Sequence, residues 1–107
     1  MAKFRSATTT NTGTTIKSTG ADVFSLSIVN RHSAAIFVKF YDSPVATFQD
    51  TPIATYQAGA NATVAFQRTS PNLFGSNNGL SVRVVTNDTD SGNTAAATLP
   101  IIEAEYN

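Results

Sequence analysis

The side chains that could do chemistry in this 107-residue chain begin with its only histidine, His32. It lies in a polar stretch, where a histidine could act as a general base if a carboxylate oriented it toward a serine nucleophile. The possible partners are Asp22, Asp42, Asp50, Ser25 and Ser33. No nucleophile-elbow pattern surrounds either serine, so we expect His32 to be a hydrogen-bonding turn residue. We do not expect the chain to be an enzyme.

A second candidate site is the run Asp88–Asn93, in which carboxylates alternate near Gly92. Such a loop can converge on a hard cation such as calcium. The bidentate glutamate and flanking helices of an EF-hand are missing, and Asp, Asn and Gly also suit a polar turn. We expect no bound metal or other cofactor, and we keep Asp88 and Asp90 as the candidate ligands.

Glu103 and Glu105 form a third candidate, because alternation places both on one face of a strand. They could form a paired-carboxylate site. The expected role is the solvent face of the last strand, where acids discourage unwanted edge association.

The elements that would position these residues are short stretches of alternating apolar and polar residues. A period of two is typical of half-buried strands. The stretches are about 23–30, 35–41, 53–57, 62–68, 80–86 and 99–106. Turn residues separate them, and Asn78-Gly79 suits a tight turn into the fifth. The sequence predicts an all-β fold, a single antiparallel β-sandwich or flattened barrel of about seven short strands.

Two further features concern surfaces. Residues 1–20 form a Thr-rich N-terminal arm before a sandwich domain at 21–107. The arm is either a frayed terminus or an extended segment that is ordered as an edge strand or on a neighbouring subunit. In the strongest strand Phe37, Lys39 and Tyr41 make a second, partly apolar face. That face is either covered within the chain or lies in a subunit interface.

Composition narrows the partners. Seven basic residues balance seven acidic ones, so the electrostatic footprint of a nucleic-acid-binding protein is missing. No apolar run approaches the roughly 18 residues that cross a bilayer, and no signal peptide is recognisable. Charged residues make up only 13% of the chain, which leaves a surface poorly protected against association with other protein.

Five segments follow one another in a familiar succession. They are Ile28-Val29-Asn30, Ser33-Ala34-Ala35, Val38–Asp42, Asp50–Ile53 and Gly79–Val82. A loop rich in Thr, Asp and Ala (86–98) and a final strand ending at Tyr106 complete the pattern. From about residue 23 to 106 the chain resembles small proteins of tailed bacteriophages, commonly of marine and cyanobacterial hosts. It departs from them at Phe48-Gln49, where the family often has a glycine.

The resemblance implies a virion structural protein, and our first choice is a capsid decoration (cement) protein. Such proteins bind the outer capsid surface at junctions between major capsid subunits and tie neighbours together. The implied partner is the major capsid protein, and a homo-oligomer is expected, with a trimer favoured and a dimer as the alternative. The implied location is the capsid surface of the virion, after synthesis in the host cytoplasm.

The residues expected at protein interfaces lie in the N-terminal arm and on the second face of the strongest strand. They are Lys3, Phe4, Arg5, Ile16, Phe37 and Tyr41. Two alternatives differ in class: a tail, head–tail connector or fibre component, and a small carbohydrate-binding module. The latter needs an exposed aromatic platform, for which Tyr56 is the candidate.

Overall fold

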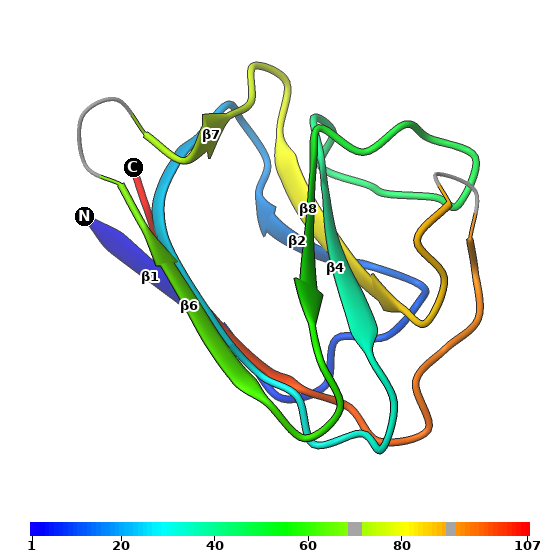
Figure 1. The fold of residues 1–107 in the computed structure, drawn as a ribbon. Coiled ribbons are helices and arrows are strands. Elements are labelled where there is room, and N and C mark those ends of the chain that lie inside the picture. Colours follow the sequence, from blue (N-terminus) through cyan, green and yellow to red (C-terminus); the bar gives the residue numbers. More distant parts are fainter. Residues whose placement is uncertain (69–71, 90–91) are drawn as a thin grey trace.

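Two antiparallel sheets pack face to face in the computed structural model, which describes residues 1–68, 72–89 and 92–107 (Figure 1). Sheet A contains, in spatial order, β1 (Ala2–Ser6), β9 (Ile101–Tyr106), β3 (Asp22–Val29) and β6 (Thr63–Gln67), with the short β7 (Phe74–Gly75) also paired to β3. Sheet B contains β2 (Thr14–Lys17), β8 (Leu80–Val85), β4 (Ile36–Tyr41) and β5 (Ala54–Ala58). The predicted all-β sandwich is confirmed. The described residues form no helix, and hence none that could span a membrane.

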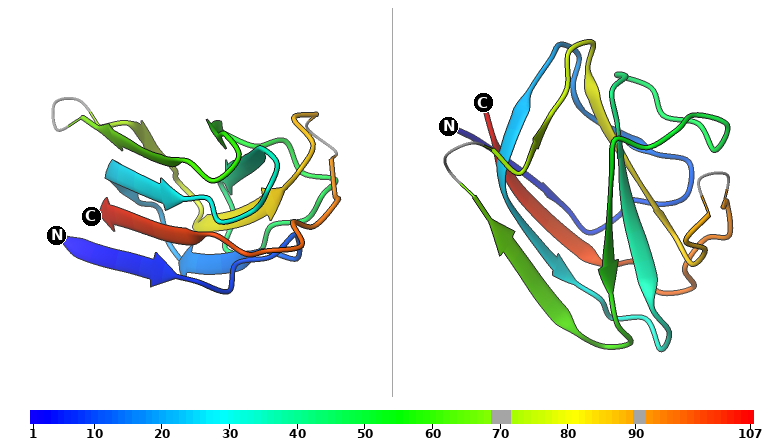
Figure 2. Two further views of the ribbon diagram at one scale, coloured as in Figure 1. Left: turned by 60° about the horizontal axis from the view of Figure 1, so that its bottom comes forward. Right: turned by 45° about the horizontal axis from the view of Figure 1, so that its top comes forward.

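The pairing of strands follows one simple rule. Strands from the first half of the chain pair with strands from the second half in reverse order: β1 with β9, β2 with β8, β3 with β6 and β4 with β5. The pairs alternate between the two sheets, as in a long hairpin that has been rolled up. This is the jelly-roll order, which is found among viral capsid and lectin domains. Figure 2 shows the layer of β1, β9, β3 and β6, with the two chain ends side by side.

Residues 1–20 supply an outer strand to each sheet. The register of β1 runs from Ala2 opposite Tyr106 to Ser6 opposite Ile102, and Thr14 of β2 lies opposite Val82. Of the alternatives for the N-terminal segment, the structure shows the ordered edge strand. Residues 1–20 and 21–107 therefore share both sheets.

The core lies between the sheets and is built from the alternating residues of the central strands. Sheet A contributes Val23, Leu26, Ile28, Ile102 and Ala104, and sheet B contributes Ile36, Val38, Phe40, Leu80, Val82 and Val84. Strict alternation along residues 23–30 predicts that Phe24 shares the core face of Leu26, and this prediction is wrong. Val23 pairs with Tyr106 and Ser25 with Glu105, so β3 has one extra residue here. This bulge turns Val23 inward and leaves Phe24 partly exposed.

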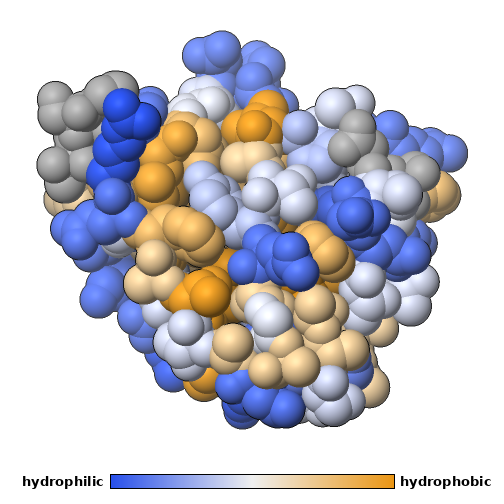
Figure 3. Space-filling model, in the orientation of Figure 1, coloured by the Kyte–Doolittle hydropathy of each residue, from blue (hydrophilic) through white to orange (hydrophobic). Residues whose placement is uncertain are grey.

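An aromatic cluster fills the side of the sandwich where β5 and β6 face each other. The rings of Tyr56 and Phe66 are 4.8 Å apart between centroids, and those of Phe40 and Phe74 are also 4.8 Å apart. Tyr56 meets the Phe40 ring edge-on at 6.1 Å. Burial in this cluster raises the pKa of the Tyr56 hydroxyl. Figure 3 shows apolar side chains gathered over this side of the molecule.

Asn30 ties together two turns at one end of the sandwich. Its buried amide donates to the carbonyls of Ala34, Ala58 and Gly59 at 3.0, 3.2 and 2.8 Å. Its Oδ1 accepts from the main-chain N–H of His32 at 2.9 Å. One side chain thus holds the connection between β3 and β4 against the turn between β5 and β6.

The turn predicted at Asn78-Gly79 depends on the missing side chain of the glycine. Gly79 has φ +158°, and a Cβ there would lie 2.4 Å from the main-chain nitrogen of Pro44. Asp42 completes the turn, because its Oδ1 accepts from the N–H groups of Asn77 and Asn78.

The raised pKa of Tyr56 predicts a loss of stability in alkali. A group whose folded pKa lies above its unfolded value, about 10 for tyrosine, stabilises the fold fully below the unfolded pKa. That contribution is lost as the pH rises through the folded pKa. Urea unfolding between about pH 9 and 11 should show Tyr56→Phe losing less stability with pH than the wild type. Parallel pH profiles for the two proteins would contradict the prediction.

Asn30→Ala should lower the free energy of unfolding by about 3 kcal/mol, because three carbonyls lose the donor that the buried Asn30 amide supplies. Chemical denaturation measures this loss. Asn72→Ala is the matched control: Asn72 donates an exposed hydrogen bond to Asp22 at 2.7 Å, and its removal should cost less than about 1 kcal/mol. Equal losses in the two variants would show that Asn30 is not the tie between the turns.

Candidate functional site

The outer side of sheet B is covered by the chain's own connections. The β1–β2 connection is bonded to β8 at Thr10, whose carbonyl accepts a hydrogen bond from the N–H of Val84 at 3.1 Å. Beneath this cover Lys39 and Tyr41 of β4 and Arg83 of β8 are fully buried. The second face of the strongest strand is therefore covered within the chain where Tyr41 lies, whereas Phe37 is only partly buried.

Arg83 holds the cover in place through a buried guanidinium. Nε donates to the Asn11 carbonyl at 2.7 Å, and Nη1 donates to the Tyr41 hydroxyl at 2.8 Å. Nη2 donates to the Gly92 carbonyl at 3.2 Å and to Asn93 Oδ1 at 2.5 Å. One side chain thus joins the β1–β2 connection, β4 and the β8–β9 connection.

Two further contacts support the arrangement around Arg83. The guanidinium carbon lies 5.8 Å from the centre of the Tyr41 ring, within the range of a cation–π interaction. Gly13, with φ +96°, passes so close that a Cβ would meet Arg83 Cγ at 3.2 Å and the Ala46 carbonyl at 3.4 Å. Lys39 lies on the same side, and its Nζ donates to the carbonyl of Thr89.

Above this clamp lies a groove of about 430 Å³ between the β1–β2 connection and the β4–β5 connection. Its lining residues are Asn11, Thr12, Val45, Ala46, Thr47, Phe48 and Asn93. Val45 is 68% exposed and Phe48 is 43% exposed, although both are large and apolar. The amide of Asn11 donates to the Asn93 carbonyl at 2.9 Å and so joins two parts of the wall. None of these lining residues is ionisable, so the groove suits a neutral, partly apolar partner.

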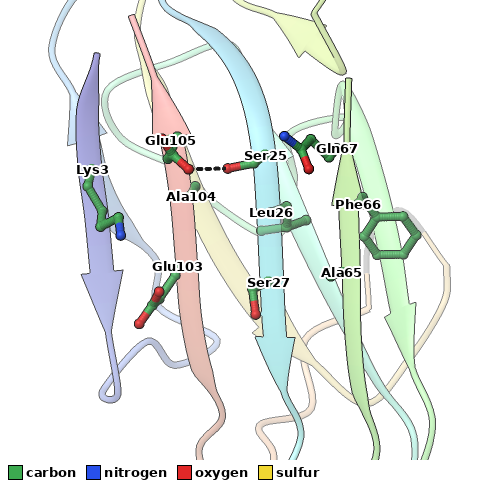
Figure 4. Close-up of a pocket in the computed structure, with 10 residues that line it drawn as sticks. All are labelled: Lys3, Ser25, Leu26, Ser27, Ala65, Phe66, Gln67, Glu103, Ala104 and Glu105. Carbon is green, nitrogen blue, oxygen red and sulfur yellow. Dashed lines mark hydrogen bonds between the residues drawn. The ribbon is translucent and has the colours of Figure 1, made fainter. Parts of the chain in front are cut away.

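The outer face of sheet A carries polar side chains around a hollow of about 160 Å³ (Figure 4). Lys3, Glu105 and Ser25 lie next to one another on β1, β9 and β3, and Ser25 Oγ donates to Glu105 at 3.2 Å. In the next row Arg5 Nε is 3.0 Å from Glu103. Glu103 and Glu105 thus share the outer face as the alternation predicts, and each has its own polar partner.

His32 lies in the connection between β3 and β4, where its carbonyl accepts from the N–H of Asn61 at 3.0 Å. The aspartates considered as its partners make hydrogen bonds in other turns. Asp22 accepts from Asn72, Asp42 from Asn77 and Asn78, and Asp50 from Thr47. The expected turn role of His32 fits these contacts.

Of the two possible metal ligands, only Asp88 is among the residues that the structure describes. Asp90 lies outside the described residues, so the pair of Asp88 and Asp90 stays a prediction. Within the described ranges, no group of three or more His, Cys, Asp or Glu side chains is placed to hold a metal ion.

The residues expected at protein interfaces take three positions. Lys3 and Arg5 lie on the outer face of sheet A, whereas Phe4 and Ile16 pack against the core from the edge strands. Phe37 and Tyr41 lie on the outer side of sheet B. The N-terminal segment does reach the surface groove, through Asn11 and Thr12. Sequence reasoning missed Val45, Phe48 and Arg83. Two apolar residues within a connection flanked by prolines were the only signal for the groove.

Comparison with known proteins adds no relative to this picture. No protein-family model, no curated protein and no solved structure matches the chain.

Arg83→Met should lower the free energy of unfolding by about 2 kcal/mol, because several buried oxygens lose a charged donor. It should also speed amide hydrogen exchange at Val84, whose N–H is bonded to Thr10, more than at core amides such as Ile28. Arg5→Met is the matched control. Arg5 is 57% exposed and its ion pair with Glu103 should contribute less than about 1 kcal/mol. Unchanged exchange at Val84 in Arg83→Met would contradict the clamp.

Proposed function

We propose that this chain is a virion structural protein of a tailed bacteriophage, a capsid decoration protein that binds the outer capsid surface and ties major capsid subunits together. Its contact with the shell is the groove and the exposed apolar residues beside it. The observation that carries the proposal is the exposure of Val45 and Phe48 on one firmly held connection.

Exposed apolar side chains that gather at one place mark a docking surface on a soluble domain. Val45 and Phe48 line the same groove, and Ile53, 39% exposed, ends the same connection. Uncharged walls of amide and hydroxyl groups surround the apolar residues. A capsid loop with an apolar side chain and unpaired main-chain groups would satisfy both kinds of contact.

The clamp beneath the groove favours binding by holding the site in one shape. Arg83 fixes Asn11 and Asn93 from below, and Gly13 passes close to both the Arg83 side chain and Ala46. A site that is already ordered loses little conformational entropy when its partner binds. A protein that stabilises a capsid under internal pressure benefits from such rigidity.

Two further points agree with this role: the fold of the chain and the many equivalent binding sites that a capsid presents. Jelly-roll domains occur among viral structural proteins, although fold alone does not decide function. A capsid presents many equivalent sites, so an oligomer that engages several of them gains avidity from a modest contact.

The test mixes the purified protein with phage capsids assembled without it and images the particles by cryo-electron microscopy. Ordered density over the shell at local symmetry axes supports the proposal. Density confined to the tail vertex would replace it with a connector or tail role. No density would overturn the virion hypothesis, and a glycan screen would then examine the lectin-like alternative, for which Phe48 rather than Tyr56 is the exposed ring.

Phe48→Asp should weaken capsid binding about tenfold or more, because it places a charge in an uncharged apolar contact. Pelleting with capsids at several protein concentrations measures the loss. Ala60→Asp is the control, since it adds the same charge in the exposed turn before β6. Equal binding by the two variants would remove the groove from the contact.

A further inference from the structure

The edges of the two sheets differ in charge. β1 carries Lys3 and Arg5, and β2 carries Lys17 and an irregular register. Residues 51–67, which include β5 and β6, contain no Asp, Glu, Lys, Arg or His. Exposed edge strands are normally protected against pairing by charges, bulges or proline. β6 has none of these, and on its outer side no strand pairs with it in the described ranges.

The hydrogen-bonding direction along β6 can be assigned residue by residue. The main-chain N–H of Asn30 donates to the Ala62 carbonyl, and the main-chain N–H of Arg68 donates to the Phe24 carbonyl, both at 2.9 Å. In an antiparallel ladder the residues that bond the neighbouring strand alternate with those that face away. The even-numbered residues 62–68 therefore bond β3, as the register of Val64 with Ile28 requires. The main-chain groups of residues 63, 65 and 67 point to the free edge.

We propose that a second copy of this chain pairs with that edge, antiparallel along β6, about a two-fold axis at Ala65. Ala65 would lie opposite the partner's Ala65, and Thr63 opposite the partner's Gln67. The three outward-facing residues of each copy would exchange about six main-chain hydrogen bonds. Sheet A would continue from one subunit into the other.

The side chains support self-pairing at β6. The central alanines are small and the outer pairs of Thr63 and Gln67 are neutral, so no charge is buried. On the core-facing side Val64 would lie opposite the partner's Phe66 and extend the aromatic cluster around Tyr56. Self-pairing of β1 would instead bring Lys3 opposite the partner's Arg5, and like charges directly opposite destabilise a sheet.

β6 is also the more accessible of the two uncharged edges. Thr63, Ala65 and Gln67 are all exposed, whereas β5 ends at the buried Ala58. A contact centred on a five-residue strand belongs to the smaller, weaker class of interface, so the dimer should form reversibly as concentration rises. This two-fold pair would take the place of the trimer implied by the resemblance, and it does not depend on capsid binding.

Cross-linking tests the register directly, because the chain contains no cysteine. Cα atoms of the paired residue 65 would be about 5.5 Å apart, within the range of a disulfide. Under mild oxidation Ala65→Cys should become a covalent dimer. Thr63→Cys is the control on the same strand, where the two thiols would lie about 13 Å apart along the strands and should cross-link far less. Equal cross-linking of both variants would overturn the proposed register.

Sedimentation analysis over a concentration series tests the dimer without a covalent cross-link. Ala65→Lys places like charges opposite each other and should remain a monomer where the wild type is a dimer. Ala2→Lys makes the same change at the exposed far edge of sheet A and should behave as the wild type. Thermal unfolding of each variant checks that it is folded. A wild type that stays monomeric at its highest soluble concentration, forms a trimer, or dimerises equally well with Ala65→Lys would overturn the proposal.

Discussion

A guanidinium sealed from water needs hydrogen-bond acceptors inside the protein, and this requirement shapes one whole side of the sandwich. Arg83 finds its acceptors in Asn11, Tyr41, Gly92 and Asn93, which belong to separate parts of the chain. The connections cannot move away from β8 without leaving a buried charge unsatisfied. The groove keeps its shape because Arg83 holds two of its lining residues, Asn11 and Asn93, from beneath.

Much of the fold could be predicted from the sequence, because alternation is a local property. The six stretches with a period of two became β3, β4, β5, β6, β8 and β9. β1 and β2 were foreseen only as one alternative for a Thr-rich segment. These two strands are ordered by pairing with residues that are distant in the sequence, as Ala2 pairs with Tyr106. The bulge at Phe24 likewise depends on how β9 aligns with β3, which no local pattern records.

The candidate site was harder to predict, since it depends on which loop covers which face. Tyr41 and Phe37 alternate on one face of β4, yet Tyr41 is sealed by loops and Phe37 is only partly covered. An arginine on a strand is expected to reach solvent, and Arg83 instead becomes the centre of the cover. Val45 and Phe48 could as well have filled the core as lined a groove. Lys3 and Arg5, by contrast, lie on the outer face of sheet A, and the alternation along β1 alone is enough to place them on the same face.

The pairing of β1 with β9 also bears on how the protein is made. Ala2 is synthesised long before its partner Tyr106. Likewise, β2 cannot pair until its partner β8 has been synthesised. Sheet B cannot close until β8 has emerged from the exit tunnel, and sheet A cannot close until β9 has, so the nascent chain exposes apolar strands during most of its synthesis. A jelly-roll order of this kind has mostly non-local contacts and folds slowly. A chaperone that shields extended segments would therefore protect the strands that still lack their partners.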